Sequence, residues 1–346
     1  MLKTAVVILN WNGREFLEKF LPSVTKFSKN DAEIIIADNA STDDSLDFLK
    51  HNYPTLRVIK NLENGGFAKG YNDALKQIEA EYYILLNSDI EVTTNWIAPV
   101  IRLMDEQPEI AACQPVIRSY HNPEKFEYAG AAGGFIDKYG YPFCKGRIFQ
   151  HIEYDTGQYN DTTEVFWATG ACLFIRAKLY HDLNGLDEDF FAHMEEIDFC
   201  WRLKNRGHKI MVCHESIVYH VGGGTLPKKS SFKTYLNMRN NIAMLYKNLP
   251  PSRLVRVLVV RLFLDMIASI KFLIDGGFKD FFAVIRAYGS FYTKIGKHRH
   301  KRRNIVHNEV SQIYRGNIVF AFYLKRKKKF SQLDMEKFRA RKPGSQ

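Results

Sequence analysis

The sequence lacks the cysteine patterns that would tie the chain together through disulfides or a zinc site. Its 5 cysteines, among 346 residues, are scattered and odd in number, and no two of them form a C-x-x-C pair. This distribution argues against a disulfide framework and a zinc–thiolate site, and it is typical of a protein in the reducing cytosol. We therefore expect all five thiols to be free and buried.

We also expect no leader segment, and the sequence contains no long uninterrupted apolar run. A buried strand is predicted from Thr4 to Asn10, with no signal peptide ahead of it. The most apolar stretch, Leu254 to Ile274, is interrupted by four charged residues, among them Arg261 and Asp265. A spanning helix needs about 20 predominantly apolar residues, so these charges argue against one. We expect a helix in the membrane interface whose Arg and Lys side chains reach water, and a helix packed on the protein core is the alternative.

Acidic residues are scarce in the last third of the chain. Residues 221–346 hold 27 Lys and Arg against 6 Asp and Glu, whereas residues 1–220 hold 22 against 32. The basic residues of this region are most concentrated in two runs, Lys297 to Arg303 and Lys325 to Lys329. A basic tail seeks polyanions, either nucleic acid or an anionic membrane surface. Because the basic runs flank apolar helices and match no nucleic-acid-reading motif, we expect a membrane surface and no nucleic acid.

What the chain does contain is an alternation of apolar runs with segments of helical periodicity. The predicted strands are Thr4–Asn10, Glu33–Ala37, Leu56–Asn61, Tyr82–Leu86 and Ile110–Ile117. Such alternation predicts an α/β fold with a mostly parallel central sheet flanked by helices. Residues 120–163 read as irregular loops with short strands, and they are followed by a strand over 164–176 and two short strands over 209–213 and 216–220.

The organisation along the chain follows from where this alternation ends. We predict a nucleotide-binding half over residues 1–118 and an acceptor-binding, catalytic half over residues 119–228. Residues 229–330 are predicted to form a helical, basic and apolar C-terminal extension that associates with a membrane. Residues 331–346 are predicted to be a disordered tail.

Polar stretches follow four of the predicted strands, at residues 10–12, 38–44, 64–72 and 87–89. In a parallel sheet these strand ends lie along one rim, where ligands bind. No G-x-G-x-x-G follows the first strand, so a Rossmann phosphate loop is not predicted. A carboxylate at residue 38 can accept from a base N–H or ribose hydroxyl, and one at residue 89 can hold a divalent cation on a diphosphate. Asn, Ser and Asp also form ordinary turns, which is the plainer alternative.

Six motifs occur in order over about residues 3–245: ILNWNG, IIIADNASTDDS, NLENGGFAKGYN, YYILLNSDIEV, WATGACLFIR and FFAHMEEIDFCWRLKNRG. This series resembles the inverting family 2 glycosyltransferases of GT-A fold, especially bacterial rhamnosyltransferase-like and galactofuranosyltransferase-like members. The resemblance implies a UDP- or dTDP-sugar donor, a divalent cation (Mg²⁺ or Mn²⁺), and a glycan or lipid-linked glycan acceptor. It also implies a role in cell-surface polysaccharide assembly, with the enzyme in the cytoplasm at the inner face of the cell membrane.

The resemblance further implies which residues meet the nucleotide sugar. That set is Asn10, Asn12, Asp38, Asn39, Ser41, Gly65, Gly66, Lys69, Asn72, Asn87 and Ser88. Asn87-Ser88-Asp89 takes the position of the family's D-x-D motif, with Asn in place of the first acid. Asp89 then becomes the main metal ligand, and His220 matches a histidine that joins the metal or diphosphate site in relatives.

The catalytic acids are also assigned through the resemblance. Glu195-Glu196 matches an acidic pair whose second member is the usual base, so Glu196 is expected to take that role. The extra methylene of Glu relative to Asp keeps Glu195 open as the base, and Asp198 matches the following acid. Trp167, Thr169 and Gly170 are expected to shape the sugar or acceptor pocket. Without the resemblance, these acids could simply favour the positive end of a helix dipole.

Two other classes of protein compete with this interpretation. A nucleotidyltransferase would need a Gly-rich basic loop after the first strand, and Asn10 to Arg14 is a poor version of one. A non-catalytic nucleic-acid- or membrane-binding protein would explain the basic tail alone. The acids needed for chemistry are present, which argues against a binder without activity.

Overall fold

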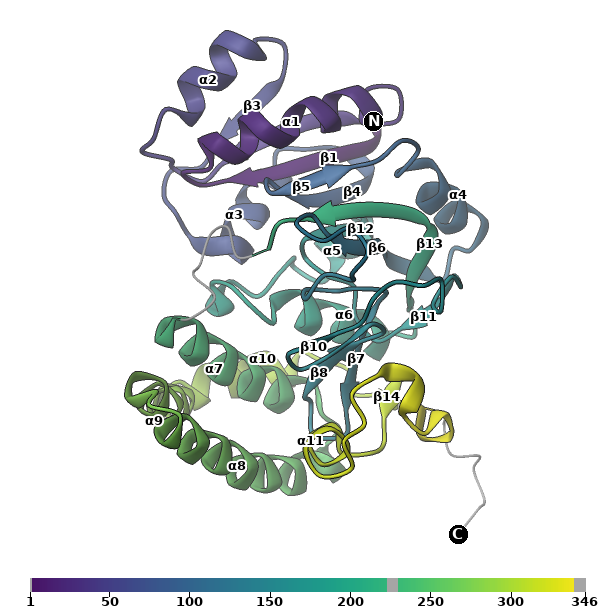
Figure 1. The fold of residues 1–346 in the computed structure, drawn as a ribbon. Helices are drawn as coiled ribbons and strands as arrows, with labels where there is room; N and C mark the ends of the chain where they lie inside the picture. Colours follow the sequence, from purple (N-terminus) through teal and green to yellow (C-terminus); the bar gives the residue numbers. More distant parts are fainter. Residues whose placement is uncertain (1, 223–229, 339–346) are drawn as a thin grey trace.

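The computed structural model describes residues 2–222 and 230–338, which form two sheets and a group of C-terminal helices (Figure 1). The larger sheet has nine strands in the order β11-β13-β6-β12-β4-β1-β2-β3, with β5 beside β13. Its strands are β1 (Leu2–Asn10), β2 (Glu33–Asp38), β3 (Arg57–Lys60), β4 (Ala80–Asn87), β5 (Ile90–Val92), β6 (Ile110–Ser119), β11 (Thr163–Val165), β12 (Cys172–Arg176) and β13 (Lys209–His220).

The parallel part of this sheet brings the predicted polar strand ends together. β1 pairs in parallel with β2 and with β4, and the register places Asn10 beside Asp38 and Leu9 beside Asn87. Parallel strands point their carboxyl ends toward one edge, so these polar ends form one rim. We call the ends of β1, β2 and β4 the polar rim.

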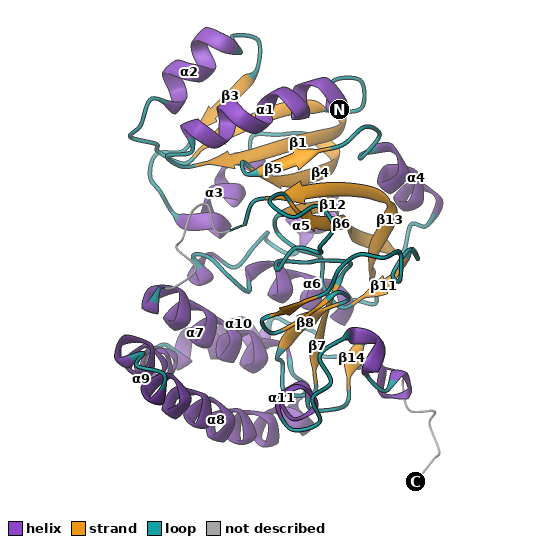
Figure 2. Cartoon of the chain, viewed as in Figure 1, coloured by secondary structure: helices purple, strands orange, loops and turns teal. Residues whose placement is uncertain are grey.

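Helices cover both faces of the sheet (Figure 2). They are α1 (Arg14–Ser28), α2 (Ser45–Asn52), α3 (Gly66–Leu75), α4 (Ala98–Glu106), α5 (Ala177–Asp182) and α6 (Glu195–Asn205). Tyr82, Ile84 and Leu86 of β4 belong to one core with α1 and α4, whereas Tyr83 and Leu85 belong to the other. Because side chains alternate along a strand, a strand buried on both faces shows a continuous apolar run, as β4 does.

The second half of the sheet differs in detail from the prediction. The predicted strand over 164–176 is divided into β11 and β12, and the intervening residues lie outside any strand. β12 runs antiparallel between β4 and β6. Two short strands predicted after residue 209 are one strand, β13, whose register with β6 shifts between Cys213 and Ile217. These differences are tertiary in origin, because pairing partners decide where a strand continues.

A second, five-stranded sheet forms from residues that read as irregular. Its order is β10-β9-β8-β7-β14, and β14 returns from the C-terminal part of the chain. The strands are β7 (Gly134–Asp137), β8 (Pro142–Cys144), β9 (Arg147–Ile148), β10 (His151–Ile152) and β14 (Ile313–Tyr314).

The predicted disordered tail is wrong for residues 331–338. Two 3₁₀ helices, η2 (Phe330–Gln332) and η3 (Met335–Phe338), lie against the second sheet. The rings of Phe330 and Phe338 pack against Phe135, tilted and edge-on respectively, at centroid distances of 5.1 and 5.3 Å. Aromatic burial against the sheet therefore orders a segment whose composition alone indicated disorder. Residues 339–346 and the predicted domain boundary at 228 lie outside the described residues.

The C-terminal extension is helical, as predicted. Its helices are α7 (Ser231–Asn248), α8 (Pro251–Ile274), α9 (Phe278–Thr293), α10 (Ile295–Arg303) and α11 (Ile318–Tyr323). α8 and α9 form the lower edge of the molecule, opposite α2 and β3 (Figure 1). In the described ranges, no helix combines the length and the apolarity needed to cross a bilayer. The expectation that Arg261 reaches toward water is wrong, because this side chain is buried against the protein. All five cysteines are free and buried, which confirms their prediction.

Candidate active site

Asn10 and Asp38 form the centre of the polar rim. Asn10 Nδ2 donates to Asp38 Oδ1 and to Ser41 Oγ, each at 3.2 Å. The backbone N–H of Ser41 donates to Asp38 Oδ2 at 3.1 Å, so the carboxylate is held from two sides. Asn10 Oδ1 is buried and has no hydrogen-bond partner. A buried acceptor without a partner costs free energy, and at a rim it marks a position where a ligand donor fits.

Two further asparagines organise the backbone around this centre. Asn12 Oδ1 accepts from the Thr42 N–H at 2.7 Å, and this ties the turn after β1 to the turn after β2. Asn39 Nδ2 donates to Asn64 Oδ1 at 2.9 Å and to the Gly66 carbonyl at 3.2 Å, next to Gly65 at the start of α3. The resemblance placed these residues at the nucleotide. The structure brings them together on the rim, mainly as supports of its loops.

Gly66 brings the polar rim into contact with the segment before α6. Its φ is +79°, and a Cβ there would lie 2.5 Å from the carbonyl oxygen of Phe191. The Phe67 N–H donates to that same carbonyl at 2.7 Å. Only glycine fits this conformation and this approach. The first N–H groups of α3 therefore bind protein, and the helix start is not free for a diphosphate.

The third part of the rim is the turn after β4. The Asn87 N–H donates to the Ala171 carbonyl at 2.9 Å, and Ser88 lies near Gly13. Asp89 is 6% exposed, and its Oδ1 lies 3.1 Å from Nε2 of His220 at the end of β13. The predicted pair of Asp89 and His220 is thus brought together from residues far apart in the sequence.

Glu127 completes this pair, and sequence reasoning missed it. Its Oε2 lies 3.3 Å from Nδ1 of His220, so the ring sits between two carboxylates. Burial opposes the charge on His220, but Asp89 and Glu127 outweigh burial and raise the pKa of His220 to about 10. Burial also disfavours ionised Asp89, yet the imidazolium outweighs it and holds the pKa of Asp89 below its ordinary value. Glu127 stands in an irregular region with no motif around it, so the sequence held no signal for it.

The Glu195–Glu196 pair opens α6 without a balancing cation. Glu195 Oε2 and Glu196 Oε2 are both buried and have no hydrogen-bond partner. Burial, followed by the charge of Glu196, raises the pKa of Glu195 well above its ordinary value. Burial raises the pKa of Glu196 to about 7. Glu195 is 4% exposed and Glu196 is half-buried. Burial thus disfavours the ionised form of both glutamates, and Glu196 is the more exposed of the two.

The backbone just before this pair is strained. Phe191, His193 and Met194 have φ angles of 65°, 70° and 74°. Such conformations cost about 1–3 kcal/mol each in non-glycine residues and cluster at functional sites. Asn240 of α7 holds the strained segment: its Nδ2 donates to the carbonyls of Phe190, Ala192 and His193 at 2.8–2.9 Å. The C-terminal extension thus fixes the start of α6.

Asp198 differs from its neighbours Glu195 and Glu196, and the expectation that it is catalytic is wrong. It is 0% exposed, and its carboxylate is saturated. It accepts from Arg202 Nε at 2.9 Å and from Asn248 Nδ2 at 2.8 Å, and it pairs with Lys247 Nζ at 2.9 Å. Asp198 therefore anchors α6 to α7.

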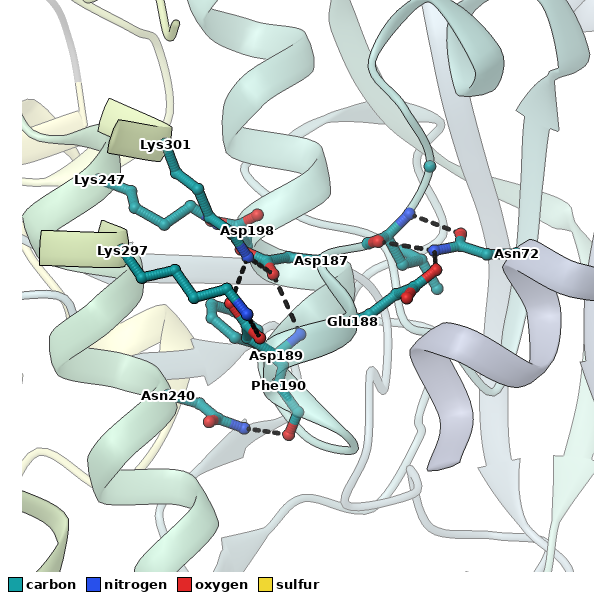
Figure 3. Close-up of polar contacts among 12 residues, drawn as sticks. Asn72, Asp187, Glu188, Asp189, Phe190, Asp198, Asn240, Lys247, Lys297 and Lys301 are labelled. Carbon is teal, nitrogen blue, oxygen red and sulfur yellow. Dashed lines mark hydrogen bonds and ion pairs between the residues drawn. The ribbon is translucent and has the colours of Figure 1, made fainter. Parts of the chain in front are cut away.

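Figure 3 shows the ion-pair network to which Asp198 belongs. Asp187 pairs with Lys247 and with Lys301, and Asp189 pairs with Lys297 and Lys301. Burial disfavours the ionised carboxylate of Asp187, but the two lysines outweigh burial and lower its pKa. A cavity of about 390 Å³ adjoins this network and contains none of the polar-rim carboxylates. Its lysines are already paired, so the network joins α7 and α10 to the segment before α6.

Asn72 and Lys69 are both bonded to other protein groups. Asn72 Nδ2 donates to Glu188 Oε1 at 3.0 Å (Figure 3) and to the Leu186 carbonyl at 2.9 Å. Its Oδ1 accepts from Tyr180 Oη at 2.6 Å. Its amide is fully used, so it supports the segment before α6 instead of lining a nucleotide. Lys69 pairs with Asp73 one turn along α3, which raises the pKa of Lys69.

Of the three predicted pocket residues, only Gly170 lies at the site. Trp167 is 3% exposed, and its Nε1 donates to the Phe135 carbonyl at 3.0 Å within the core. Thr169 is 2% exposed, and its N–H donates to Gln114 Oε1 at 2.9 Å. A Cβ on Gly170 would lie 3.7 Å from Glu196 Cβ and 3.1 Å from the Phe67 ring. The pocket prediction is therefore wrong for Trp167 and Thr169, which are structural.

The divalent cation implied by the resemblance would need ligands among these side chains. In the part of the chain that the structure describes, no group of three or more His, Cys, Asp or Glu is arranged to hold a metal alone. Asp89 offers an oxygen, and His220 would offer a nitrogen beside it once a cation replaced the proton on Nε2, while Glu127 holds the far nitrogen of the ring, as carboxylates do for metal-bound histidines. Mg²⁺ typically takes one or two carboxylates and completes its shell with substrate phosphates and water. The residues fit a cation that is shared with a diphosphate.

A largely parallel sheet, a polar rim over its strand ends and an unpaired acid opening a helix beside it define a GT-A type transferase. The chain belongs to the family described as glycosyl transferase family 2, whose profile matches residues 5–183. This assignment confirms the resemblance and the prediction of a transferase. It argues against the alternative that the chain is a nucleotidyltransferase.

Individual relatives are more distant. An N-acetylglucosaminyl-diphospho-decaprenol L-rhamnosyltransferase of Mycobacterium tuberculosis is 23% identical over 238 residues, 64% of this chain and 76% of that protein. TarS 1–349 of S. aureus, solved with UDP-GlcNAc, aligns with a TM-score of 0.56 at 17% identity, covering 87% of this chain and 84% of TarS 1–349. GalNAc-T7, solved with UDP, GalNAc and Mn²⁺, aligns with a TM-score of 0.56 at 18% identity over 72% of this chain. The alignment spans 49% of the GalNAc-T7 chain. The structural likenesses confirm the GT-A fold.

Proposed function

We propose that this protein is an inverting glycosyltransferase that moves a sugar from a UDP- or dTDP-sugar to a hydroxyl of a glycan or lipid-linked glycan. The observation that carries the proposal is Glu196, an unpaired, half-buried carboxyl whose pKa is raised to about 7 beside Gly170. The relatives add support: the M. tuberculosis protein is named for a lipid-diphosphate acceptor, and TarS was solved with UDP-GlcNAc. The transfer takes place at the cytoplasmic face of the membrane, and its product is used to build cell-surface polysaccharide.

Glu196 acts as the general base in a single displacement. The ionised carboxylate accepts the proton of the acceptor hydroxyl, whose oxygen forms a bond to the anomeric carbon. The bond from that carbon to the diphosphate oxygen breaks at the same time, and its electron pair leaves with the nucleoside diphosphate. Attack opposite to the leaving group inverts the anomeric configuration. A base with a pKa near the working pH is the most effective choice for such a transfer.

The polar rim binds the nucleotide in this proposal. Asp38 accepts from an N–H of the base or from a ribose hydroxyl, and the free Oδ1 of Asn10 accepts a second donor. Asp89 and His220 hold a divalent cation, Mg²⁺ or Mn²⁺, and Glu127 keeps the ring of His220 in place. When bound, the cation offsets the negative charge that develops on the leaving diphosphate.

A thermal-shift and hydrolysis screen tests the proposal. The purified chain is mixed with UDP-, dTDP- and GDP-sugars, each with Mg²⁺, Mn²⁺ or EDTA. A ligand that binds only the folded state raises the melting temperature by mass action. We expect a cation-dependent rise with one donor, lost in Asp89→Ala and retained in Glu196→Gln, with hydrolysis and transfer lost in both variants. No rise with any donor, in a chain that unfolds cooperatively, would contradict the proposal.

A further inference from the structure

An ordinary surface helix turns its apolar side chains to the protein and its charged side chains to water. α8 does the reverse along its middle. The two charged side chains in the middle of the helix face the protein: Arg261 and Asp265 are 2% and 0% exposed. They pair with each other at 3.1 Å, and Asp265 accepts from Tyr141 Oη and Tyr288 Oη, each at 2.9 Å. Every charge in the middle of the helix is therefore satisfied inside the protein.

The outward side of α8 carries large apolar side chains. Val255, Phe263, Ile267 and Ile274 are 71%, 65%, 65% and 79% exposed. Together with Val259 and Ile270, they recur every three to four residues, so they share one face of the helix. The charges that interrupted this stretch in the sequence do not interrupt this face between residues 257 and 270.

α9 continues the apolar surface. It follows α8 across the Gly276–Gly277 turn and packs against it. Phe278 and Phe282 are 63% and 62% exposed, and Ile285 and Tyr292 add to the same side. We call the exposed apolar residues of α8 and α9 the apolar face. Contiguous apolar surface of this kind marks an interaction site, whereas single exposed apolar residues are ordinary.

The charged residues around the apolar face indicate which kind of partner covers it. Residues 251–293, which span α8 and α9 and are all described by the structure, contain 6 Lys and Arg against 3 Asp and Glu. Asp265 is buried and Asp280 bonds to Thr234, so Asp275 is the one exposed acid in that range, and it pairs with Lys271. A second copy of this chain would bring two sets of these cations together. An anionic surface complements them.

We propose that the apolar face docks this protein onto an anionic lipid bilayer. The apolar side chains of α8 and α9 enter the headgroup region, and the flanking Arg256, Lys271, Lys279 and Arg286 meet anionic headgroups. The helices lie on the bilayer and do not cross it. This docking rests on the surface of the C-terminal extension and is independent of the proposed sugar transfer, although it would bring the enzyme to a lipid-linked acceptor.

Vesicle sedimentation of the full chain tests the docking. The probes are phosphatidylcholine vesicles with and without phosphatidylglycerol. The double variant Phe263→Glu/Ile267→Glu places charges in the apolar face, and we expect about 100-fold weaker binding. The matched control is Leu62→Glu, a fully exposed apolar residue two positions after β3, which should bind as wild type does. Raised salt and omission of phosphatidylglycerol should each weaken wild-type binding several-fold.

Two measurements keep the result unambiguous. The double variant should keep the melting temperature and the donor-dependent shift of the wild type, because both residues are exposed; Phe282→Glu on α9 is an independent second variant. Failure of wild type to sediment, or unchanged sedimentation of the double variant, would overturn the docking while leaving the sugar transfer untouched. Light scattering that shows a wild-type dimer, turned into a monomer by the double variant and without vesicle binding, would assign the face to a second copy and also overturn it.

Discussion

Two groups of acids lie between residues 187 and 198 and have opposite electrostatic surroundings. Asp187, Asp189 and Asp198 are each paired with lysines or an arginine (Figure 3). Glu195 and Glu196 have buried oxygens without partners. Pairing lowers the pKa of Asp187 and Asp189, whereas burial without a cation raises the pKa of both glutamates. Paired acids hold the structure together, and the unpaired acids remain available for proton transfer.

The largest effect on activity is expected from the unpaired group. Glu196→Gln keeps the shape of the side chain but cannot accept a proton, so kcat should fall by about 10³-fold. The donor-dependent thermal shift should be retained, because the variant leaves the polar rim unchanged. Steady-state transfer assays with the donor found in the screen measure the loss. Glu195→Gln should cost much less, and an equal loss in both variants would remove the distinction between them.

The paired group should instead affect stability. Asp198→Asn leaves Arg202 and Lys247 buried without their shared carboxylate, and we expect the free energy of unfolding to fall by about 3 kcal/mol. Urea denaturation measures this change. The matched control is Lys178→Ala, which removes an exposed pair with Asp182 and should cost less than about 1 kcal/mol. If Asp198→Asn were as mild as the control, the anchoring role of Asp198 would be wrong.

Asn240 connects the two groups and should affect kcat more than KM. Asn240→Ala removes its hydrogen bonds to the carbonyls of Phe190, Ala192 and His193 and lets the start of α6 move, and a displacement of about 1 Å can cost about 100-fold in rate. Asn237→Ala is the control on the same helix, because among the described residues the Asn237 side chain bonds to the Lys233 carbonyl within α7 alone. Kinetics of both variants at matched stability separate positioning from unfolding. A rise in KM alone would mean that Asn240 serves binding.

The pH profile is expected to show the smallest effect. Glu196 must be ionised to accept a proton, so kcat/KM should rise with pH, by about tenfold per unit, and level off above the pKa of about 7. Stability should change in the opposite direction. The raised pKa means that the folded state binds the proton more tightly than the unfolded state does, so this stability is present below the ordinary value of 4.5 and is lost as the pH rises toward about 7. Glu196→Gln should remove this loss of stability. Urea denaturation at about pH 4.5 and at about pH 7 measures the difference.

The sequence by itself determined the sheet, the polar rim and the acidic pair. Apolar runs that alternate with helical segments leave little choice but a largely parallel sheet, and parallel strands bring Asn10, Asp38 and Asn87 to one edge whatever the rest of the chain does. The order of the motifs was enough to predict the family.

Only the tertiary structure decided which polar groups are left without partners. Glu127 meets His220, and Lys247 meets Asp198, across long stretches of sequence, so no local pattern distinguishes Asp198 from Glu196. The same holds for α8, where Arg261 faces inward because Asp265, the Tyr139 carbonyl and the Tyr141 ring satisfy its guanidinium there. A sequence shows which side chains carry charge. Burial and long-range pairing decide whether that charge holds the fold, accepts a proton or leaves an apolar face outside.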